Sequence, residues 1–136
     1  MSDNEFKVTF PGGVRVDAAY GGFTIRTDQP VRDGGEGSAP SPFVLFLASL
    51  ATCAGYYVLS FCRERNIPAS GIELTMRTER DAEGKMISLA SITISLPPDF
   101  PEKYAGAVVK SAERCTVKAH LQFPPDIETS AVIRKA

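Results

Sequence analysis

The stretch from Ser41 to Cys62 carries no charged residue, although 23% of the whole chain is charged. As a helix it would measure about 30 Å, enough to cross the apolar core of a bilayer. Small or weakly polar side chains dilute its hydrophobicity: Ala48, Ser49, Ala51, Thr52, Cys53, Ala54, Gly55 and Ser60. Two interpretations follow, a membrane span and the central helix of a soluble protein, buried on nearly all sides. The second is favoured, because amphipathic segments flank the stretch on both sides.

The size and charge of the chain limit its partners. It has 136 residues, with 15 Lys and Arg against 16 Asp and Glu, which predicts one domain over residues 1–136. A formal net charge of -1 and the absence of a local basic patch argue against nucleic acid or an anionic membrane surface as a partner. No secretory signal is recognisable, so we expect a reducing cytoplasm.

Before the central helix, apolar and polar residues alternate in three short segments. This pattern predicts three strands with one buried face, and the apolar positions are Phe6, Val8, Phe10, Val14, Val16, Phe23 and Ile25. Turns are expected at the two glycine pairs, Gly12-Gly13 and Gly21-Gly22. Ser41 is expected to cap the helix, with Pro42 at its first position and an end near Asn66, before Pro68.

The second half of the chain predicts a hairpin, a helix and a last strand. Two β-rich runs, 72–76 and 86–96, flank a turn at 81–84, and a change of apolar phase indicates a bulge near Ala90 or burial of both faces. Pro101 opens a helix whose inward stripe holds Tyr104, Val108, Ser111 and Cys115. The run Ile127 to Ile133 predicts a final strand. The order β-β-β-α-β-β-α-β is that of an α+β domain.

Three cysteines are the main candidates for chemistry: Cys53, Cys62 and Cys115. Cys53 and Cys62 lie about 13.5 Å apart along one helix and on opposite faces, so they cannot bond to each other. An intrachain disulfide would therefore use Cys115, and Cys53 and Cys115 occupy apolar faces that could meet in the core. The alternative is that the cysteines only fill the core as small apolar residues, the usual role of a free cysteine.

Other cysteine chemistry has less support. With His120 as the one histidine, a zinc site would need it and all three cysteines, at spacings unlike those of standard zinc motifs. A Ser-His-Asp triad on His120 lacks the GxSxG elbow. We therefore expect no metal and no cofactor.

Two segments around the cysteines have a recognisable sequence. One is PSPFVLFLASLATC, from Pro40 to Cys53, and the other is AERCTV, from Ala112 to Val117, which precedes the predicted last strand. They resemble the central-helix motif and the second-cysteine motif of the OsmC/Ohr family of thiol-dependent hydroperoxide reductases, although Thr116 stands where a proline is usual. The order of elements matches that family over nearly the whole chain.

The resemblance implies a fold, an assembly and a reaction. The fold is the OsmC-like α+β fold, as an intertwined homodimer whose central helices are enclosed by sheets from both subunits. Cys53 would attack a small-molecule hydroperoxide, preferably an organic one, and become a sulfenic acid that Cys115 resolves as a disulfide. A small dithiol or a thioredoxin-like reductant would reopen that disulfide.

The match is weaker at the residues that support the peroxide site. The family carries an arginine from an N-terminal hairpin, and a glutamate at the start of the central helix that holds it. Arg15 is the candidate arginine, with an outward charge on a half-buried strand as the alternative. Phe43 and Val44 stand where the glutamate is expected, and Glu36 in the glycine-rich loop is a possible substitute. This departure favours a second hypothesis, a weakly active or non-catalytic dimer that binds an apolar or thiol-reactive molecule.

Overall fold

The computed structural model describes residues 4–136. Its contacts divide the chain into two compact units, one that ends at Ser49 and one that begins at Leu50. The division falls inside helix α1 (Pro42–Glu64), so each unit contains part of that helix. The single domain over residues 1–136 stays a prediction.

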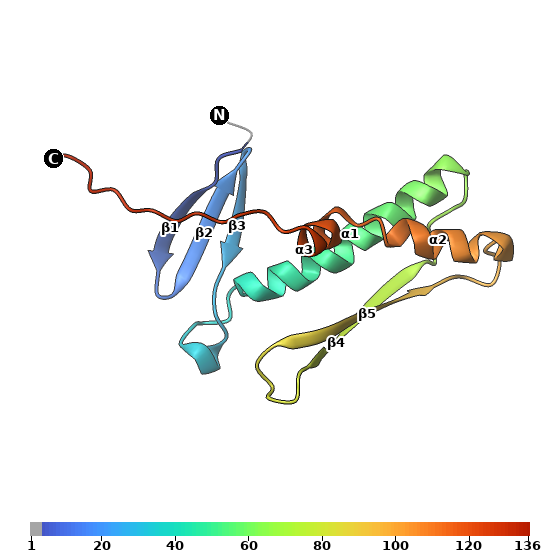
Figure 1. Ribbon diagram of the computed structural model, residues 1–136, viewed down its shortest axis with the longest axis horizontal. Helices are drawn as coiled ribbons and strands as arrows, with labels where there is room; N and C mark the ends of the chain where they lie inside the picture. The colour runs from blue at the N-terminus through green and yellow to red at the C-terminus, as the bar shows by residue number, and fades with distance from the viewer. Residues whose placement is uncertain (1–3) are drawn as a thin grey trace. The chain divides into compact units, whose positions relative to one another are not determined.

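The first unit contains a three-stranded antiparallel sheet (Figure 1). The strands β1 (Lys7–Gly12), β2 (Arg15–Tyr20) and β3 (Phe23–Thr27) pair in sequence order, as the alternating pattern predicts. The expected buried face is wrong for the single chain, because Phe10 and Phe23 are 81% and 73% exposed. The sheet therefore presents apolar side chains that its own unit does not cover.

A buried aspartate organises the loop between β3 and α1. Asp28 is 1% exposed and accepts hydrogen bonds from the hydroxyl of Ser38 at 2.6 Å and from the backbone N–H groups of Gln29, Ser38 and Glu36 at 2.8, 3.0 and 3.3 Å. The Ser38 hydroxyl, with these N–H groups, lowers the pKa of Asp28 to about 2. Gly35 is required here, because a Cβ would clash with the carbonyl oxygen of Gln29. The 3-10 turn η1 (Val31–Asp33) lies in the same loop.

The start of α1 is as predicted, and its end comes slightly earlier. The Ser41 hydroxyl accepts a hydrogen bond from the backbone N–H of Val44 at 3.3 Å, which makes it the helix cap, and Pro42 follows at the first position. The helix ends at Glu64, because Asn66 adopts the left-handed conformation (φ 55°) and Ile67 N–H bonds back to the carbonyl of Cys62 at 2.9 Å.

The central helix is not buried on nearly all sides within the single chain, so that expectation is wrong for one copy. Its buried residues are Ala54, Val58, Phe61 and Cys62, all in the second half. In a single copy, the hairpin and the two short helices that follow it can cover only one face of α1. By length and composition α1 could also cross a membrane, a property that the core helices of soluble proteins share.

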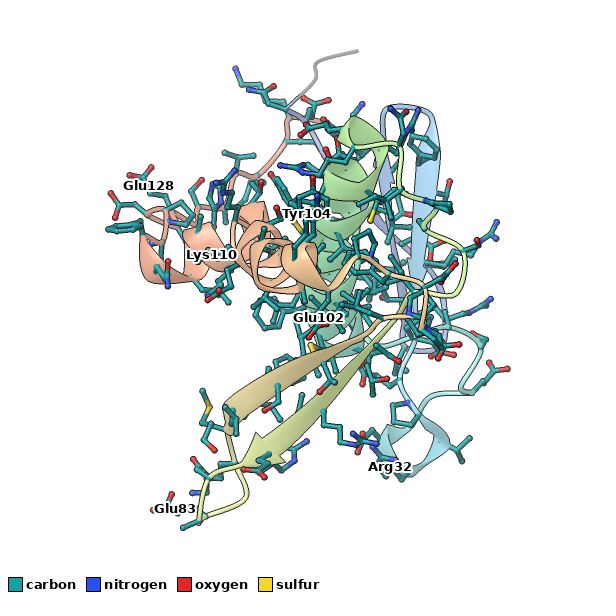
Figure 2. The ribbon with its side chains drawn as sticks, turned by 90° about the vertical axis from the view of Figure 1, so that its right-hand side faces the viewer. Arg32, Glu83, Glu102, Tyr104, Lys110 and Glu128 are labelled. Atoms are coloured by element: carbon teal, nitrogen blue, oxygen red, sulfur yellow. The ribbon has the colours of Figure 1, made fainter. Side chains whose placement is uncertain are left out.

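The second unit has a two-stranded hairpin, formed by β4 (Glu73–Arg80) and β5 (Ile87–Ser95). Figure 2 shows Glu83 at its far tip, pointing away from the helices. Pairing is regular from Glu73 opposite Ser95 to Glu79 opposite Leu89, and the irregularity falls at Ser88. The predicted bulge is therefore displaced from Ala90 by two residues.

The predicted helix from Pro101 is divided by a turn. A 3-10 turn η2 (Glu102–Tyr104) leads into α2 (Ala105–Ala112), and a second helix, α3 (Thr116–Gln122), follows. Cys115 is extended (φ -51°, ψ 124°) and caps α3 instead of continuing α2, so the expected stripe ends before it. One helix through Cys115 is thus wrong, although Cys115 still faces inward with 3% of its surface exposed.

The predicted last strand is absent from the part of the chain that the structure describes. Residues 124–136 have no regular secondary structure, and Ile127 and Ile133 are 87% and 99% exposed. A strand needs a partner for its backbone groups, and in the single copy residues 124–136 pair with no strand of either sheet. The observed order is β-β-β-α-β-β-α-α, which keeps the α+β class.

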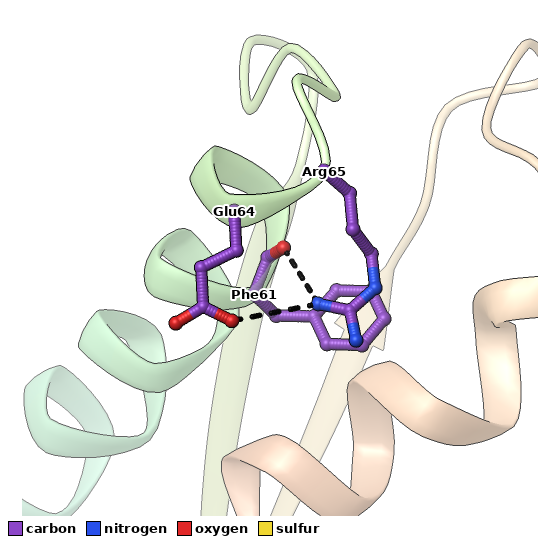
Figure 3. A network of polar contacts seen from close by, with 3 residues as sticks. All are labelled: Phe61, Glu64 and Arg65. Atoms are coloured by element: carbon purple, nitrogen blue, oxygen red, sulfur yellow. Dashed lines mark hydrogen bonds and ion pairs between the residues drawn. The ribbon is translucent and has the colours of Figure 1, made fainter.

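The core of the second unit lies where α1 and α2 pack on the hairpin. One cluster joins Ala54, Val58 and Ala112, and the other joins Phe61, Cys62 and Val108; Ile72 and Ile94 pack on both. Beside the second cluster, Figure 3 shows the guanidinium of Arg65 over the Phe61 ring at 3.7 Å. Its Nη1 donates to the Phe61 carbonyl at 3.2 Å and lies 3.7 Å from Glu64 Oε2. These contacts cover the end of α1.

Candidate active site

The second unit brings two of the three thiols together. Cys53 lies about three turns from the start of α1 and is partly buried, whereas Cys115 is the buried cap of α3. The Cys115 thiol is hydrogen-bonded to the sulfur of Cys53, and both are free thiols. The two residues that the motifs single out are therefore neighbours, 62 positions apart in the sequence.

The start of α3 points its backbone toward Cys53. Burial by itself would raise the pKa of the Cys53 thiol. Three hydrogen bonds outweigh this effect and lower the pKa: they come from the backbone N–H of Val117, the Cys115 thiol and the backbone N–H of Thr116. All three donors belong to residues 115–117. Cys53 therefore has the stabilised thiolate that a nucleophile needs.

The pKa of Cys115 moves the opposite way. Burial raises it, and the neighbouring Cys53 adds to the effect by accepting the Cys115 proton in a hydrogen bond and by its own negative charge. The backbone N–H of Lys118, which lies 3.4 Å from Sγ, opposes this only in part. Of the two thiols, Cys53 therefore has the lower pKa, which makes it the better candidate for the nucleophile.

A side-chain hydrogen bond connects the two helices beside the thiols. The hydroxyls of Tyr57 and Thr116 lie 2.8 Å apart, and either can be the donor. Tyr57 follows Cys53 by one helical turn, and Thr116 follows Cys115 directly. The sequence places Tyr57 on the helix face that carries Cys53, four residues further along, but it does not predict the hydrogen bond to Thr116, which depends on how α3 packs.

An apolar cavity adjoins one of the two thiols. It has a volume of about 170 Å³ and includes Cys115 but not Cys53 in its lining. Its wall is mainly aliphatic and comes from α1, β5 and α2, with Glu113 and Lys118 as its charged residues; the aliphatic members are Leu50, Ala54, Ile92, Ile94, Val109 and Ala112. The space next to Cys115 thus suits an apolar group.

Cys62 lies apart from this pair. It is fully buried in the cluster with Phe61 and Val108. Burial raises its pKa, which nearby Arg65 offsets only in part. Cys62 therefore has the environment of a small apolar core residue, in agreement with the interpretation from its helix face.

The candidate arginine belongs to the first unit. Arg15 folds back over the β1–β2 turn, where its Nε donates to the Gly12 carbonyl at 3.3 Å. A Cβ at Gly13 would lie 3.8 Å from Oε1 of Glu36, so the Glu36 carboxylate reaches the same turn. Among residues 4–136 no ion pair within 4 Å includes Arg15. Its role at the thiols stays a prediction, and the same holds for Glu36 as its partner.

Metal binding has no geometric support in the second unit or the first. Within residues 4–136, no group of three or more His, Cys, Asp and Glu side chains is arranged to hold a metal ion. His120 has its Nδ1 2.7 Å from the Thr116 carbonyl oxygen, one turn back in α3.

The sequence is similar to a known protein family over the region that contains the thiol pair. Residues 35–130 match the model of the family described as OsmC-like protein, and this match covers the thiol pair and all three α-helices. The chain belongs to the OsmC-like family. No curated protein matches it at the level required for significance.

Solved structures of OsmC-like proteins share the fold. One, from Psychrobacter arcticus, is described as an osmotic stress induced and detoxification response protein; it is 27% identical, with a TM-score of 0.72, over 88% of this chain and 87% of that one. The organic hydroperoxide resistance protein OhrB of Bacillus subtilis is 25% identical, with a TM-score of 0.50, over 85% and 90% of the two chains. An OsmC protein of Legionella pneumophila, named as an organic hydroperoxide resistance protein, is 20% identical with a TM-score of 0.54, over 90% and 92%. The predicted OsmC-like α+β fold is therefore confirmed.

Proposed function

We propose that this OsmC-like protein reduces organic hydroperoxides with its cysteine pair. The observation that carries the proposal is the contact between Cys53 and Cys115 with their pKa values shifted in opposite directions. A peroxidase of this type needs a thiol of low pKa that attacks the peroxide and a second thiol close enough to condense with the sulfenic acid. Membership of the family, and the name of the Bacillus subtilis relative as an organic hydroperoxide resistance protein, support the same role.

The reaction has three balanced steps. The Cys53 thiolate attacks the distal oxygen of ROOH and the O–O bond breaks, which gives Cys53–SOH and an alkoxide that takes a proton from water to become the alcohol ROH. The Cys115 sulfur then attacks the sulfenic sulfur, which forms the disulfide and releases water. A dithiol reductant, or a thioredoxin-like protein, takes up the disulfide by thiol exchange and returns both cysteines to the reduced state.

We propose that the working form is a homodimer. Helix α1 leaves several large apolar side chains exposed in one copy: Phe43, Val44, Phe46, Tyr56 and Leu59. Large exposed apolar side chains on a helix that carries no charge before Arg63 are typical of an interface. Burial of these side chains between two copies in the cytoplasm would explain the apolar character of α1 without a membrane. We propose no nucleic acid as a partner.

Arg15 completes the proposed site as the cation next to the peroxide. A guanidinium near a thiolate lowers its pKa and can donate hydrogen bonds to the peroxide oxygens. Its proposed partner carboxylate is Glu36, since Phe43 and Val44 at the helix start have no charge. No metal and no cofactor is needed for this chemistry.

The decisive experiment is dithiol-dependent consumption of cumene hydroperoxide and of hydrogen peroxide, with dithiothreitol as the reductant. We expect turnover by the parent with preference for cumene hydroperoxide, and none by Cys53→Ser. Cys62→Ala is the matched control, because Cys62 is buried away from the pair, and it should keep the parent rate. Turnover that survives Cys53→Ser would remove Cys53 as the nucleophile.

A second candidate function is binding without turnover. The apolar cavity beside Cys115 and the lack of a carboxylate at the helix start favour it. In that case the parent would consume neither peroxide, while an apolar thiol-reactive probe such as N-phenylmaleimide would label Cys53 or Cys115 far faster than free cysteine at the same pH. Peroxide turnover at Cys53 would decide against this second candidate.

A further inference from the structure

Helix α3 is short, and its first turn provides backbone N–H groups that lower the pKa of Cys53. It has seven residues, none of them buried, yet the backbone N–H groups at its start donate to the sulfur of Cys53. An isolated helix of this length is not stable in water, because its few internal hydrogen bonds do not repay the cost of nucleation. Some contact outside α3 must therefore hold its first turn in place.

The hydrogen bond between Tyr57 and Thr116 is suited to this purpose. At 2.8 Å it has the ordinary length of a hydrogen bond between two hydroxyls, whereas the contact of Cys115 Sγ with the Leu50 carbonyl, also between α1 and the start of α3, is at 4.0 Å a weak one even for sulfur. Thr116 is the first residue of α3 and itself one of the two backbone donors to Cys53. A contact that restrains the Thr116 side chain therefore also restrains its backbone N–H.

The residue type at this position makes the restraint necessary. A proline, which the resemblance leads us to expect after the second cysteine, would have its φ fixed near the helical value by its ring. Threonine has no such ring, so its backbone is free to move unless the side chain is held. In this chain the side chain of Thr116 is hydrogen-bonded to the hydroxyl of Tyr57.

We propose that Tyr57 and Thr116 are positioning residues, whose hydroxyl hydrogen bond keeps the first turn of α3 against α1 and so keeps the backbone donors of Thr116 and Val117 directed at the Cys53 sulfur. The inference deepens the proposed function, since it concerns how the same nucleophile is activated. The titratable side chain that acts on the pKa of Cys53 is Cys115, from the start of α3, and the hydroxyl of Tyr57 contacts the hydroxyl of Thr116. Residues 115–117 supply every hydrogen bond that shifts the Cys53 pKa.

The test measures the pKa of Cys53 in the reduced protein from the pH dependence of iodoacetamide alkylation, with each cysteine followed separately by fragment-resolved mass spectrometry. Tyr57→Phe and Thr116→Val each remove one hydroxyl at almost unchanged volume. We expect either to raise the pKa by roughly half a unit to one unit, about three- to tenfold less thiolate below the pKa. The double variant should shift no further than one single variant, because both remove the same bond.

Two controls separate positioning from general structure. Thr116→Ser keeps the hydroxyl and should keep the parent pKa, and Tyr104→Phe removes a hydroxyl from a tyrosine that packs on Phe61 and should also leave the pKa unchanged. A merely structural role would lower the unfolding midpoint without moving the pH profile. Parent-like pKa values in both Tyr57→Phe and Thr116→Val, or an equal shift in Tyr104→Phe, would overturn the proposal.

The outcome is separable from that of the proposed function, because no peroxide is present in the alkylation assay. An unshifted pKa with intact peroxide turnover in the parent removes only the positioning role of Tyr57 and Thr116. A shifted pKa in a protein that consumes no peroxide leaves the positioning role intact and removes the peroxidase.

Discussion

Oxidation of the thiol pair should stabilise the protein, because the two thiols are already close enough in the reduced fold to shift each other's pKa. One equivalent of peroxide is expected to form a disulfide between Cys53 and Cys115 and to leave Cys62 free. The bond closes a loop of about 60 residues, for which the loss of chain entropy in the unfolded state corresponds to about 4 kcal/mol. Little of this should be lost to strain, since neither helix has to move far.

The assay is urea unfolding of the oxidised and the reduced protein at the same concentration, because a dimer unfolds in a concentration-dependent way. With a slope of about 2 kcal/mol/M, a gain of 4 kcal/mol moves the midpoint up by about 2 M. Cys62→Ala should lower both midpoints but keep their difference, and Cys115→Ser should abolish the difference.

Two results would refute this reasoning. An oxidised protein with an equal or lower midpoint would mean that the bond forms only at the expense of the native packing. A peptide linked through Cys62 as the main product would mean that α1 opens before the disulfide forms, since Cys62 is fully buried in the reduced fold.

Three further predictions concern single side chains. Cys115→Val keeps the apolar bulk but loses the thiol donor, so the pKa of Cys53 should rise by roughly half a unit to one unit, as read from the pH of half-maximal alkylation. Val108→Ala, at a position with no exposed surface, should lower the free energy of unfolding by about 2 kcal/mol in urea titrations without changing that pKa. Asp28 contributes stability that is complete above its ordinary pKa of 3.8 and is lost as the pH falls toward about 2, because Ser38 and the loop N–H groups depress its pKa. Acid titration of Asp28→Asn should lack this loss between pH 4 and 2, and an unchanged acid profile would argue against the role of Asp28.

The sequence by itself determined the features that depend on neighbouring residues. Alternation in the first strands, the Ser41-Pro42 helix start and the segregation of strands from helices are local patterns, and each is found in the structure. The exclusion of a Cys53–Cys62 bond is likewise local, because the geometry of one helix places them on opposite faces.

Tertiary structure decided what depends on residues distant in sequence. That Cys115 caps a new helix, and that this helix directs its N–H groups at Cys53, follows from packing between α1 and α3 and could not be found from the apolar stripe alone. The expected strand at 127–133 had the correct residue pattern, but a strand also requires a paired backbone partner, and in the single copy these residues pair with no strand of either sheet. Periodicity thus determines which elements a segment can form, whereas the available partner determines which of them it does form.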